Sequence, residues 1–400
     1  MEKLPQLALQ LEEVMPFEDS LADFDSTYRA ETQYGEYVSV SSDRVRFDGE
    51  TVGDAGLCSQ LMIGQKLGNG SCSSVVFARH ATTGQAFAIK LFSVFDRAKR
   101  AQFITELGML VNIDCDSLIK FYSAYCDSNT GQIGVIIEYM NFGSLEVLLT
   151  PKYRVNERSL AAIGYQIMWA LAYLHHDNNL HRDIKPGNVL MNTDGWCKLS
   201  DFGISTQLES VDSMSSSMKG SFPYMSPERL DGQDYNASSD IWSVGVLMME
   251  LYEQRYPFRE ASSTHVDLSI EFQSIDIDKY LMKTGYPKVM AEFLSSTLQR
   301  NPQDRPEASA LLQSEWFKYM GIYDLDHATD ALRKWLEQTA RCVDPEKNMC
   351  RMENSEDKNC PESLIWFQSC KESEGLKSDR KDEESNRGGS RSNYDSIYHR

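Results

Sequence analysis

The sequence contains no apolar run long enough to cross a bilayer. A membrane-spanning helix needs about 20 consecutive, mostly apolar residues, and no stretch of the 400-residue chain approaches that length. Residues 1–5 also lack the basic start and apolar core of a secretory signal peptide. Neither end carries a myristoylation or prenylation motif. We therefore expect no membrane partner and a cytoplasmic location.

Paired cysteines are also missing. The chain has nine cysteines, an odd number, and they are scattered with no Cys-x-x-Cys pair. Disulfide frameworks and zinc sites show regular, closely spaced cysteines, so this pattern favours free thiols in a reducing compartment.

Basic residues are scarce relative to acidic ones. Lysine and arginine total 40 against 59 aspartates and glutamates, a formal net charge of −19. Such a chain repels polyanions, so nucleic acid is not expected as a general partner. A local basic pocket for one anionic ligand stays compatible with this charge. The hydrophobic share of 41% is sufficient for a sizeable core.

The pattern of the chain changes near residues 60 and 342. Residues 1–60 are acidic and mostly aperiodic, which predicts a flexible region with a short apolar stretch at its tip. Residues 61–140 alternate as strands do, apart from an amphipathic helix predicted over 99–113. From residue 159 helical periodicity dominates, within a larger lobe expected over 141–320, and 321–341 is expected to form one more helix. Residues 342–400 return to a charged, flexible composition. We therefore expect an α+β protein with a ligand between a small β-rich lobe and a larger α-helical lobe.

A glycine-rich segment lies between the first two predicted strands. Residues 68–75 read Gly-x-Gly-x-x-Ser-x-Val. Glycines in such a segment let backbone N–H groups approach phosphate oxygens. A tight turn is the more frequent meaning of a lone Gly-Asn-Gly, and Ser73 stands where a third glycine is usual. Because a strand follows the glycines, a dinucleotide-binding fold is disfavoured.

Two charged residues stand where apolar ones are expected. Lys90 ends a strand that otherwise reads as buried, and Glu106 is the acid on the apolar side of the helix over 99–113. Each alone is most simply a solvated surface charge. Together they fit a lysine that contacts phosphate oxygens and a glutamate that holds it.

The strongest chemical signal comes from two motifs in the second half. Residues 181–188 read His-Arg-Asp-Ile-Lys-Pro-Gly-Asn, and residues 201–203 read Asp-Phe-Gly. With the glycine segment and Ala-Ile-Lys at 88–90, their order and spacing resemble the eukaryotic protein kinases. The resemblance covers about residues 60–320. It implies the two-lobed protein kinase fold, with one regulatory helix in the N-lobe, and ATP and Mg²⁺ as cofactors.

The resemblance also implies a role for each site residue. Asp183 would orient the acceptor hydroxyl and take its proton, and Lys185 would neutralise the transferring phosphoryl group. Lys90, held by Glu106, would contact the α- and β-phosphates. The metal-binding residues would be Asn188 and Asp201. The implied ATP-binding set is Leu67, Gly68, Asn69, Gly70, Ser71, Cys72, Ser73, Val75, Ala88, Lys90, Ile137, Glu138, Met140, Asn188 and Asp201.

Within the kinases, residues 224–230 (Tyr-Met-Ser-Pro-Glu-Arg-Leu) resemble the mitogen-activated protein kinase kinases. The serines at 213 and 217 have the Ser-x-x-x-Ser spacing of animal members, whereas residues 138–145 look closer to plant members. The resemblance implies phosphorylation of a MAP kinase on Thr and Tyr, and activation of this chain at Ser213 and Ser217 by an upstream MAP kinase kinase kinase. Serine-rich loops are also common without such a role.

Two segments resemble docking elements of that family. Lys3 and the apolar residues 7–9 form a thin version of the motif that binds the MAP kinase; a frayed helix fits equally well. Residues 330–336 resemble the helix that engages the upstream kinase, or a helix that caps the large lobe. Rival functions are another Ser/Thr kinase of the same broad group and a pseudokinase scaffold. The latter is disfavoured because every catalytic residue type is present. The identity of the substrate, the upstream kinase and the oligomeric state cannot be read from the sequence.

Overall fold

The computed structural model describes residues 28–31, 37–40, 45–47, 50–52, 56–69, 73–93, 107, 113–127, 132–201, 222–233, 236–258, 272 and 275–340. The chain divides into two compact units, Met1–Glu356 and Asp357–Arg400, and the second lies wholly outside the described residues. So do the predicted tail, the N-terminal docking motif, Glu106 and the phosphosites Ser213 and Ser217. Among the described helices, none is both long and apolar enough to cross a membrane.

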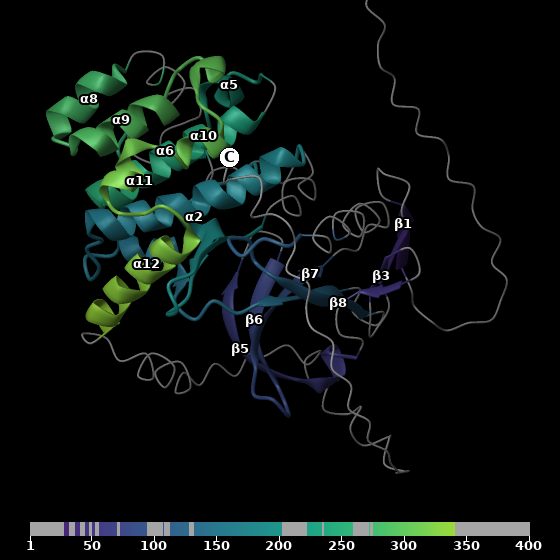
Figure 1. Ribbon diagram of the computed structural model, residues 1–400. Coiled ribbons are helices and arrows are strands. Elements are labelled where there is room, and N and C mark those ends of the chain that lie inside the picture. Colours follow the sequence, from purple (N-terminus) through teal and green to yellow (C-terminus); the bar gives the residue numbers. More distant parts are fainter. Residues whose placement is uncertain are drawn as a thin grey trace, which may run out of the picture. The chain divides into compact units, whose positions relative to one another are not determined.

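The first lobe is a five-stranded antiparallel sheet with the order β5-β6-β7-β9-β8 (Figure 1). Its strands are β5 (Leu61–Asn69), β6 (Ser73–His80), β7 (Ala86–Ser93), β8 (Phe121–Asp127) and β9 (Gln132–Glu138). The sheet confirms the β-rich lobe predicted from alternation over this region. Of the helix predicted over 99–113, the structure describes Leu107, which is helical and fully buried, and Ile113, which is not helical.

The second lobe is built around two buried helices. α2 (Glu157–His176) and α6 (Ala237–Glu253) pack against each other, and both begin at an asparagine cap whose side chain accepts a backbone N–H. Most of their side chains are buried, including Trp242 at 1% exposed. Around them lie α5 (Pro227–Leu230), α8 (Ile277–Thr284), α9 (Lys288–Thr297), α10 (Ala308–Leu311) and α11 (Glu315–Tyr319).

A small sheet lies on the second lobe beside α2. It has the order β10 (Gly143–Ser144), β11 (Val189–Met191) and β12 (Cys197–Leu199), all antiparallel. A parallel bridge joins Leu118, which precedes β8, to Leu199 of β12. The backbone of the first lobe therefore contacts the strand that leads to Asp201.

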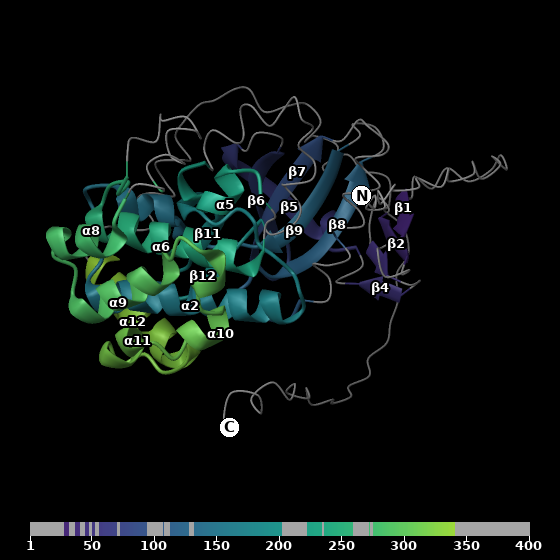
Figure 2. The same ribbon diagram turned by 90° about the horizontal axis from the view of Figure 1, so that it is seen from above.

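The last described helix, α12 (Leu325–Ala340), packs along α2 (Figures 1 and 2). Its apolar residues Leu332, Trp335 and Leu336 are buried in the core of the lobe. Of the two roles predicted for residues 330–336, the structure shows the capping one. The exposed side chains of this helix are polar or charged, among them Lys334 and Glu337.

The N-terminal region differs from the flexible segment predicted for residues 1–60. Four short strands form an antiparallel meander: β1 (Tyr28–Glu31), β2 (Tyr37–Val40), β3 (Val45–Phe47) and β4 (Glu50–Val52). Alternating residues such as Tyr-Val-Ser-Val in β2 favour strands. The Asp-Gly pair at 48–49, between β3 and β4, is typical of tight hairpins. The acidic composition of the region concealed this pattern.

Candidate active site

The loop between α2 and β11 brings three of the predicted site side chains together, two of them predicted as catalytic and one as a metal ligand. Lys185 Nζ lies 2.7 Å from Asp183 Oδ2. Asn188 Nδ2 donates to the backbone carbonyl and to Oδ2 of Asp183, both at 2.8 Å. Because the amide nitrogen of Asn188 faces Asp183, its amide oxygen is left as the acceptor for a cation.

A buried aspartate at the start of α6 holds this loop in place. Asp240 is fully buried and accepts the backbone N–H groups of His181 and Arg182, each at 3.0 Å. His175 Nε2, at the end of α2, lies 2.8 Å from the same carboxylate. The three contacts tie the loop that carries Asp183 to both core helices.

The neutral side chain of His181 forms hydrogen bonds to two backbone groups. Its Nε2 lies 3.0 Å from the backbone carbonyl of Ser200, and its Nδ1 lies 3.3 Å from the backbone N–H of Asp183. A carbonyl only accepts and an N–H only donates, so the geometry requires the tautomer protonated at Nε2. Burial lowers the pKa of His181, against the charge of Asp240, and favours the same neutral form. The histidine thereby links the catalytic aspartate to the residue before Asp201.

Strand pairing gathers the predicted nucleotide-binding side chains of the sheet on one face. Lys90 lies directly opposite Val75 on β6, and Ala88 lies opposite Ile137 on β9. Residues two apart in a strand point to the same side, and directly opposed residues share a side. Val75, Ala88, Lys90 and Ile137 therefore share one face of the sheet.

Lys90 reaches across to the second lobe. Its Nζ lies 2.5 Å from Asp201 Oδ1, although Lys90 belongs to β7 and Asp201 follows β12. Lys90 is 8% exposed, so the lysine is held within the protein rather than on its surface. The expected pairing of Lys90 with Glu106 lies outside the described residues and stays a prediction.

The glycine segment is described only at its two ends. Leu67, Gly68 and Asn69 end β5, and Ser73 begins β6, whereas residues 70–72 lie outside the described residues. A Cβ added at Gly68 would meet no described atom within 4 Å. This open side of the strand would admit the close approach of a phosphate to the backbone.

The last residue of β9 has a partner that sequence reasoning missed. The carboxylate of Glu138 lies 2.8 Å from Lys198 Nζ of β12, and both side chains are largely buried. Glu138 therefore directs its side chain toward the second lobe, so only its backbone could serve a ligand. A lysine three residues before Asp201, in a strand that is otherwise apolar, was the available signal. Met140, which follows, is buried, and its carbonyl accepts the N–H of Gly143.

The donor set fits magnesium held together with phosphates. Mg²⁺ prefers oxygen ligands and is usually held by one or two carboxylates plus substrate phosphates. Asp201 and Asn188 supply a carboxylate and an amide oxygen, and Ser200 connects them because its backbone N–H donates to the Asn188 carbonyl at 2.9 Å. No group of three or more His, Cys, Asp or Glu able to hold a metal occurs in the described ranges.

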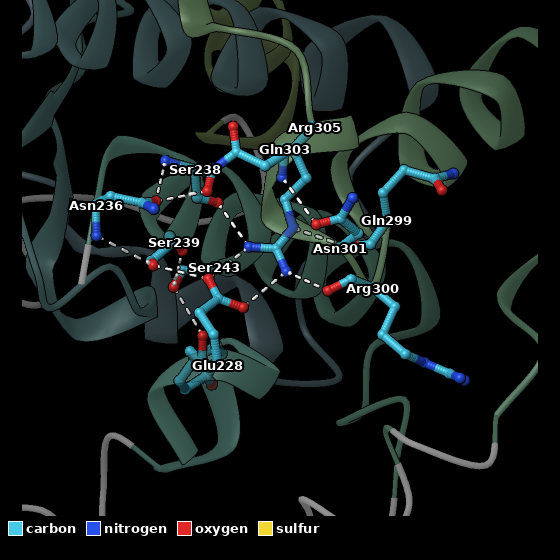
Figure 3. A network of polar contacts seen from close by, with 11 residues as sticks. Glu228, Asn236, Ser238, Ser239, Ser243, Gln299, Arg300, Asn301, Gln303 and Arg305 are labelled. Atoms are coloured by element: carbon cyan, nitrogen blue, oxygen red, sulfur yellow. Dashed lines mark hydrogen bonds and ion pairs between the residues drawn. The ribbon is translucent and has the colours of Figure 1, made fainter. Parts of the chain in front are cut away.

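A buried ion pair supports the site from the second lobe (Figure 3). Two nitrogens of Arg305 lie 2.7 and 2.9 Å from the carboxylate of Glu228, which also accepts the Ser239 hydroxyl at 2.8 Å. Burial alone would raise the pKa of Glu228, but the hydrogen bonds and charge of Arg305 outweigh it and lower that pKa.

Comparison with known proteins agrees with this geometry. The family model described as "Protein kinase domain" matches residues 61–317. The chain is 33% identical over 282 residues to mitogen-activated protein kinase kinase 2 of Arabidopsis thaliana, covering 68% of this chain and 77% of that protein. It is 32% identical to mitogen-activated protein kinase kinase 1 of the same plant, with 65% and 75% covered. Identity to the dual specificity mitogen-activated protein kinase kinase dSOR1 of Drosophila melanogaster is 31%, with 65% and 71% covered.

Proposed function

Because the chain belongs to the mitogen-activated protein kinase kinases, a family of ATP-dependent protein kinases, we propose that it phosphorylates the Thr and Tyr of a MAP kinase activation loop. The observation that carries the proposal is the cluster of Asp183, Lys185 and Asn188 beside the Lys90–Asp201 pair. The name of the Drosophila relative supports the dual specificity.

In this proposal each side chain acts by position and charge. Asp183 accepts the proton of the substrate hydroxyl, and Lys185, 2.7 Å away, offers its charge to the transferring phosphoryl group. Asn188 and Asp201 hold magnesium, which when bound neutralises the phosphates. Lys90 leaves Asp201 to contact the α- and β-phosphates. Phosphoryl transfer needs little covalent help from the protein, so this arrangement suffices.

Activation is proposed to follow phosphorylation of Ser213 and Ser217 by an upstream kinase. A phosphate adds about −1.5 to −2 charge and three acceptor oxygens. Arg182 is the proposed partner because its backbone is fixed on both sides: its N–H donates to Asp240, and its carbonyl accepts from Arg229 at 2.6 Å. A phosphate bound there would order the segment that leads to Ser226, which precedes α5.

The partners proposed are a downstream MAP kinase and an upstream kinase, with a cytoplasmic location. The relatives' names support the cascade role. Because α12 buries Leu332 and Trp335, an upstream kinase that docks here would have to contact its exposed polar and charged side chains. The motif at Lys3 and residues 7–9 stays a prediction.

The test is an assay of the Ser213→Asp, Ser217→Asp protein with Mg-ATP and a catalytically inactive MAP kinase containing Thr-x-Tyr, with phosphosites identified by mass spectrometry. We expect phosphate on both Thr and Tyr, and at least a roughly 100-fold loss in the Asp201→Ala variant. Phosphorylation of a generic basic protein but not of the MAP kinase would favour another Ser/Thr kinase. ATP binding with no transfer would favour a pseudokinase.

A further inference from the structure

The two proposed magnesium ligands flank one short hairpin. One precedes its first strand and the other follows its second strand, so both lie at the end opposite the turn. Asn188 directly precedes β11, and Asp201 follows β12 by two residues. The register pairs Val189 with Leu199 and Met191 with Cys197, and the bond from Ser200 N–H to the Asn188 carbonyl closes that end. Three paired residues span about 10 Å. A short, continuous series of backbone pairs therefore connects the hairpin turn to the end that carries Asn188 and Asp201. A displacement of the turn would be transmitted to that end through these pairs.

The inner side of the turn is held by a buried glutamine. Gln166 of α2 is fully buried, and its Nε2 donates to the Gly195 carbonyl at 3.1 Å. Its Oε1 accepts the backbone N–H of Cys197 at 2.9 Å. One side chain thus bonds the turn and the first residue of β12 to the core helix.

A second side chain joins the turn to the segment after β9. Asn141 Oδ1 accepts the backbone N–H of Thr193 at 2.8 Å, and its Nδ2 lies 2.9 Å from the Thr193 hydroxyl. The turn is therefore tied both to α2 and to the connection between the lobes.

The outer side of the turn is covered by α12. A Cβ added at Gly195 would lie 2.8 Å from both Cβ and N of Arg333, and closer still to the carbonyl oxygen of Thr329. Those atoms are mainly helix backbone, which cannot rotate away as a side chain can. Gly195 also has φ +93°, a left-handed conformation that favours glycine. The absence of a side chain at residue 195 is what lets α12 lie directly on the turn.

We propose that α12 acts as a clamp on the metal site, meaning that its contact with Gly195 fixes the positions of Asn188 and Asp201. Mg²⁺-dependent ATP binding then depends on how α12 packs against the turn and α2. Gly195 and Gln166 are then positioning residues. The inference rests on the proposed function, because it requires Asn188 and Asp201 to be the magnesium ligands.

The experiment measures ATP binding by calorimetry as Mg²⁺ is titrated into the full chain, together with hydrogen exchange in residues 325–340. The Cβ added by Gly195→Ala should push α12 away from the turn. Leu332→Ala should weaken the packing of α12 on α2, because Leu332 is fully buried. Gly285→Ala is the matched control, because it has φ +82° but no described atom within 4 Å of an added Cβ. Asp201→Asn reports on the metal assignment itself.

We expect Gly195→Ala and Leu332→Ala to lower exchange protection in α12 and to raise the Mg²⁺ concentration for half-maximal ATP binding by roughly 2- to 30-fold. Gly285→Ala should leave the curve unchanged. A cooperative unfolding transition in each variant confirms that it is folded. If α12 loses protection while the curve stays in place in both variants, α12 is only a cap and the clamp is overturned. If Asp201→Asn also leaves the Mg²⁺ dependence of ATP binding unchanged, the assignment of Asp201 as a magnesium ligand is wrong. The clamp is then overturned as well, because it depends on that assignment.

Discussion

Arg182 and Asp201 adopt left-handed backbone conformations, with φ of +71° and +63°. Such a conformation costs a non-glycine residue roughly 1–2 kcal/mol. It persists at Arg182 because its N–H is bonded to Asp240 and its carbonyl to Arg229. Both strained residues lie at the proposed catalytic centre, where surrounding contacts fix the backbone in a form that the loop alone would not keep.

The Glu228–Arg305 pair allows a prediction at the same scale. Glu228→Gln leaves the Arg305 charge buried without its partner, so we expect a loss of about 3–5 kcal/mol in the free energy of unfolding. Both side chains are almost fully buried. Chemical denaturation near neutral pH measures the loss. Glu337→Gln, which removes an exposed partner of Arg333, is the control and should change stability little.

The pH dependence of that loss is a second readout. The pKa of Glu228 is lowered in the folded protein from the ordinary value of 4.5. The stabilisation is therefore complete above that value and is lost as the pH falls through the lower, folded pKa. The difference between the wild type and Glu228→Gln should be constant near neutral pH and shrink in acid. Equal losses in Glu228→Gln and Glu337→Gln would contradict the role of burial.

At the scale of elements, α12 shows how packing decides between two uses of one helix. Its apolar stripe is compatible with a partner or with the core of its own lobe. In the structure the stripe faces α2, and Trp335 is 6% exposed. Any partner that needed these side chains would first have to detach the helix.

Trp335→Ala should therefore act mainly on stability. Removing a buried indole costs about 3–5 kcal/mol, which thermal unfolding would reveal as a clear drop in Tm. Lys334→Ala, at an exposed neighbouring position, should change Tm little. If Trp335→Ala left Tm unchanged, the stripe would not be seated in solution and would be available for docking.

For the whole molecule, two ion pairs among the described residues join the β-sheet lobe to the helical lobe. Lys90 pairs with Asp201, and Glu138 pairs with Lys198, so both pairs include a residue near β12. The loop and strand that carry the proposed metal ligands are thereby connected to the proposed nucleotide-binding face. A ligand bound there would contact both lobes and stabilise them together.

Mg-ATP should accordingly raise the stability of the entire fold. A ligand at 100 times its Kd contributes about 2.7 kcal/mol, which a thermal shift assay would detect. We expect the shift to disappear in Lys90→Met and to be reduced when EDTA removes Mg²⁺. A full shift in Lys90→Met would contradict the proposed contact with the phosphates.

The extent of sequence-based prediction follows from what each pattern encodes. Alternation and helical periodicity predicted the two lobes because side-chain direction repeats every two residues in strands and about every 3.6 in helices. The motifs at residues 181–203 resemble those of the protein kinases, and that resemblance implied the proposed catalytic set. The short strands of the acidic N-terminal region were not predicted, because an acidic composition is typical of flexible segments.

Other features depend on contacts between residues far apart in the chain. Lys198 and Glu138 are 60 residues apart, and Gly195 lies against a helix that begins 130 residues later. No local pattern encodes such a meeting, because each partner taken alone fits an ordinary surface lysine, glutamate or turn glycine. The resemblance of the motifs was enough to predict the family, and local periodicity was enough to predict the lobes. Three features were decided only by tertiary packing. They are the face of α12 that is buried, the contacts that hold the hairpin carrying Asn188 and Asp201, and the partners of the charged side chains.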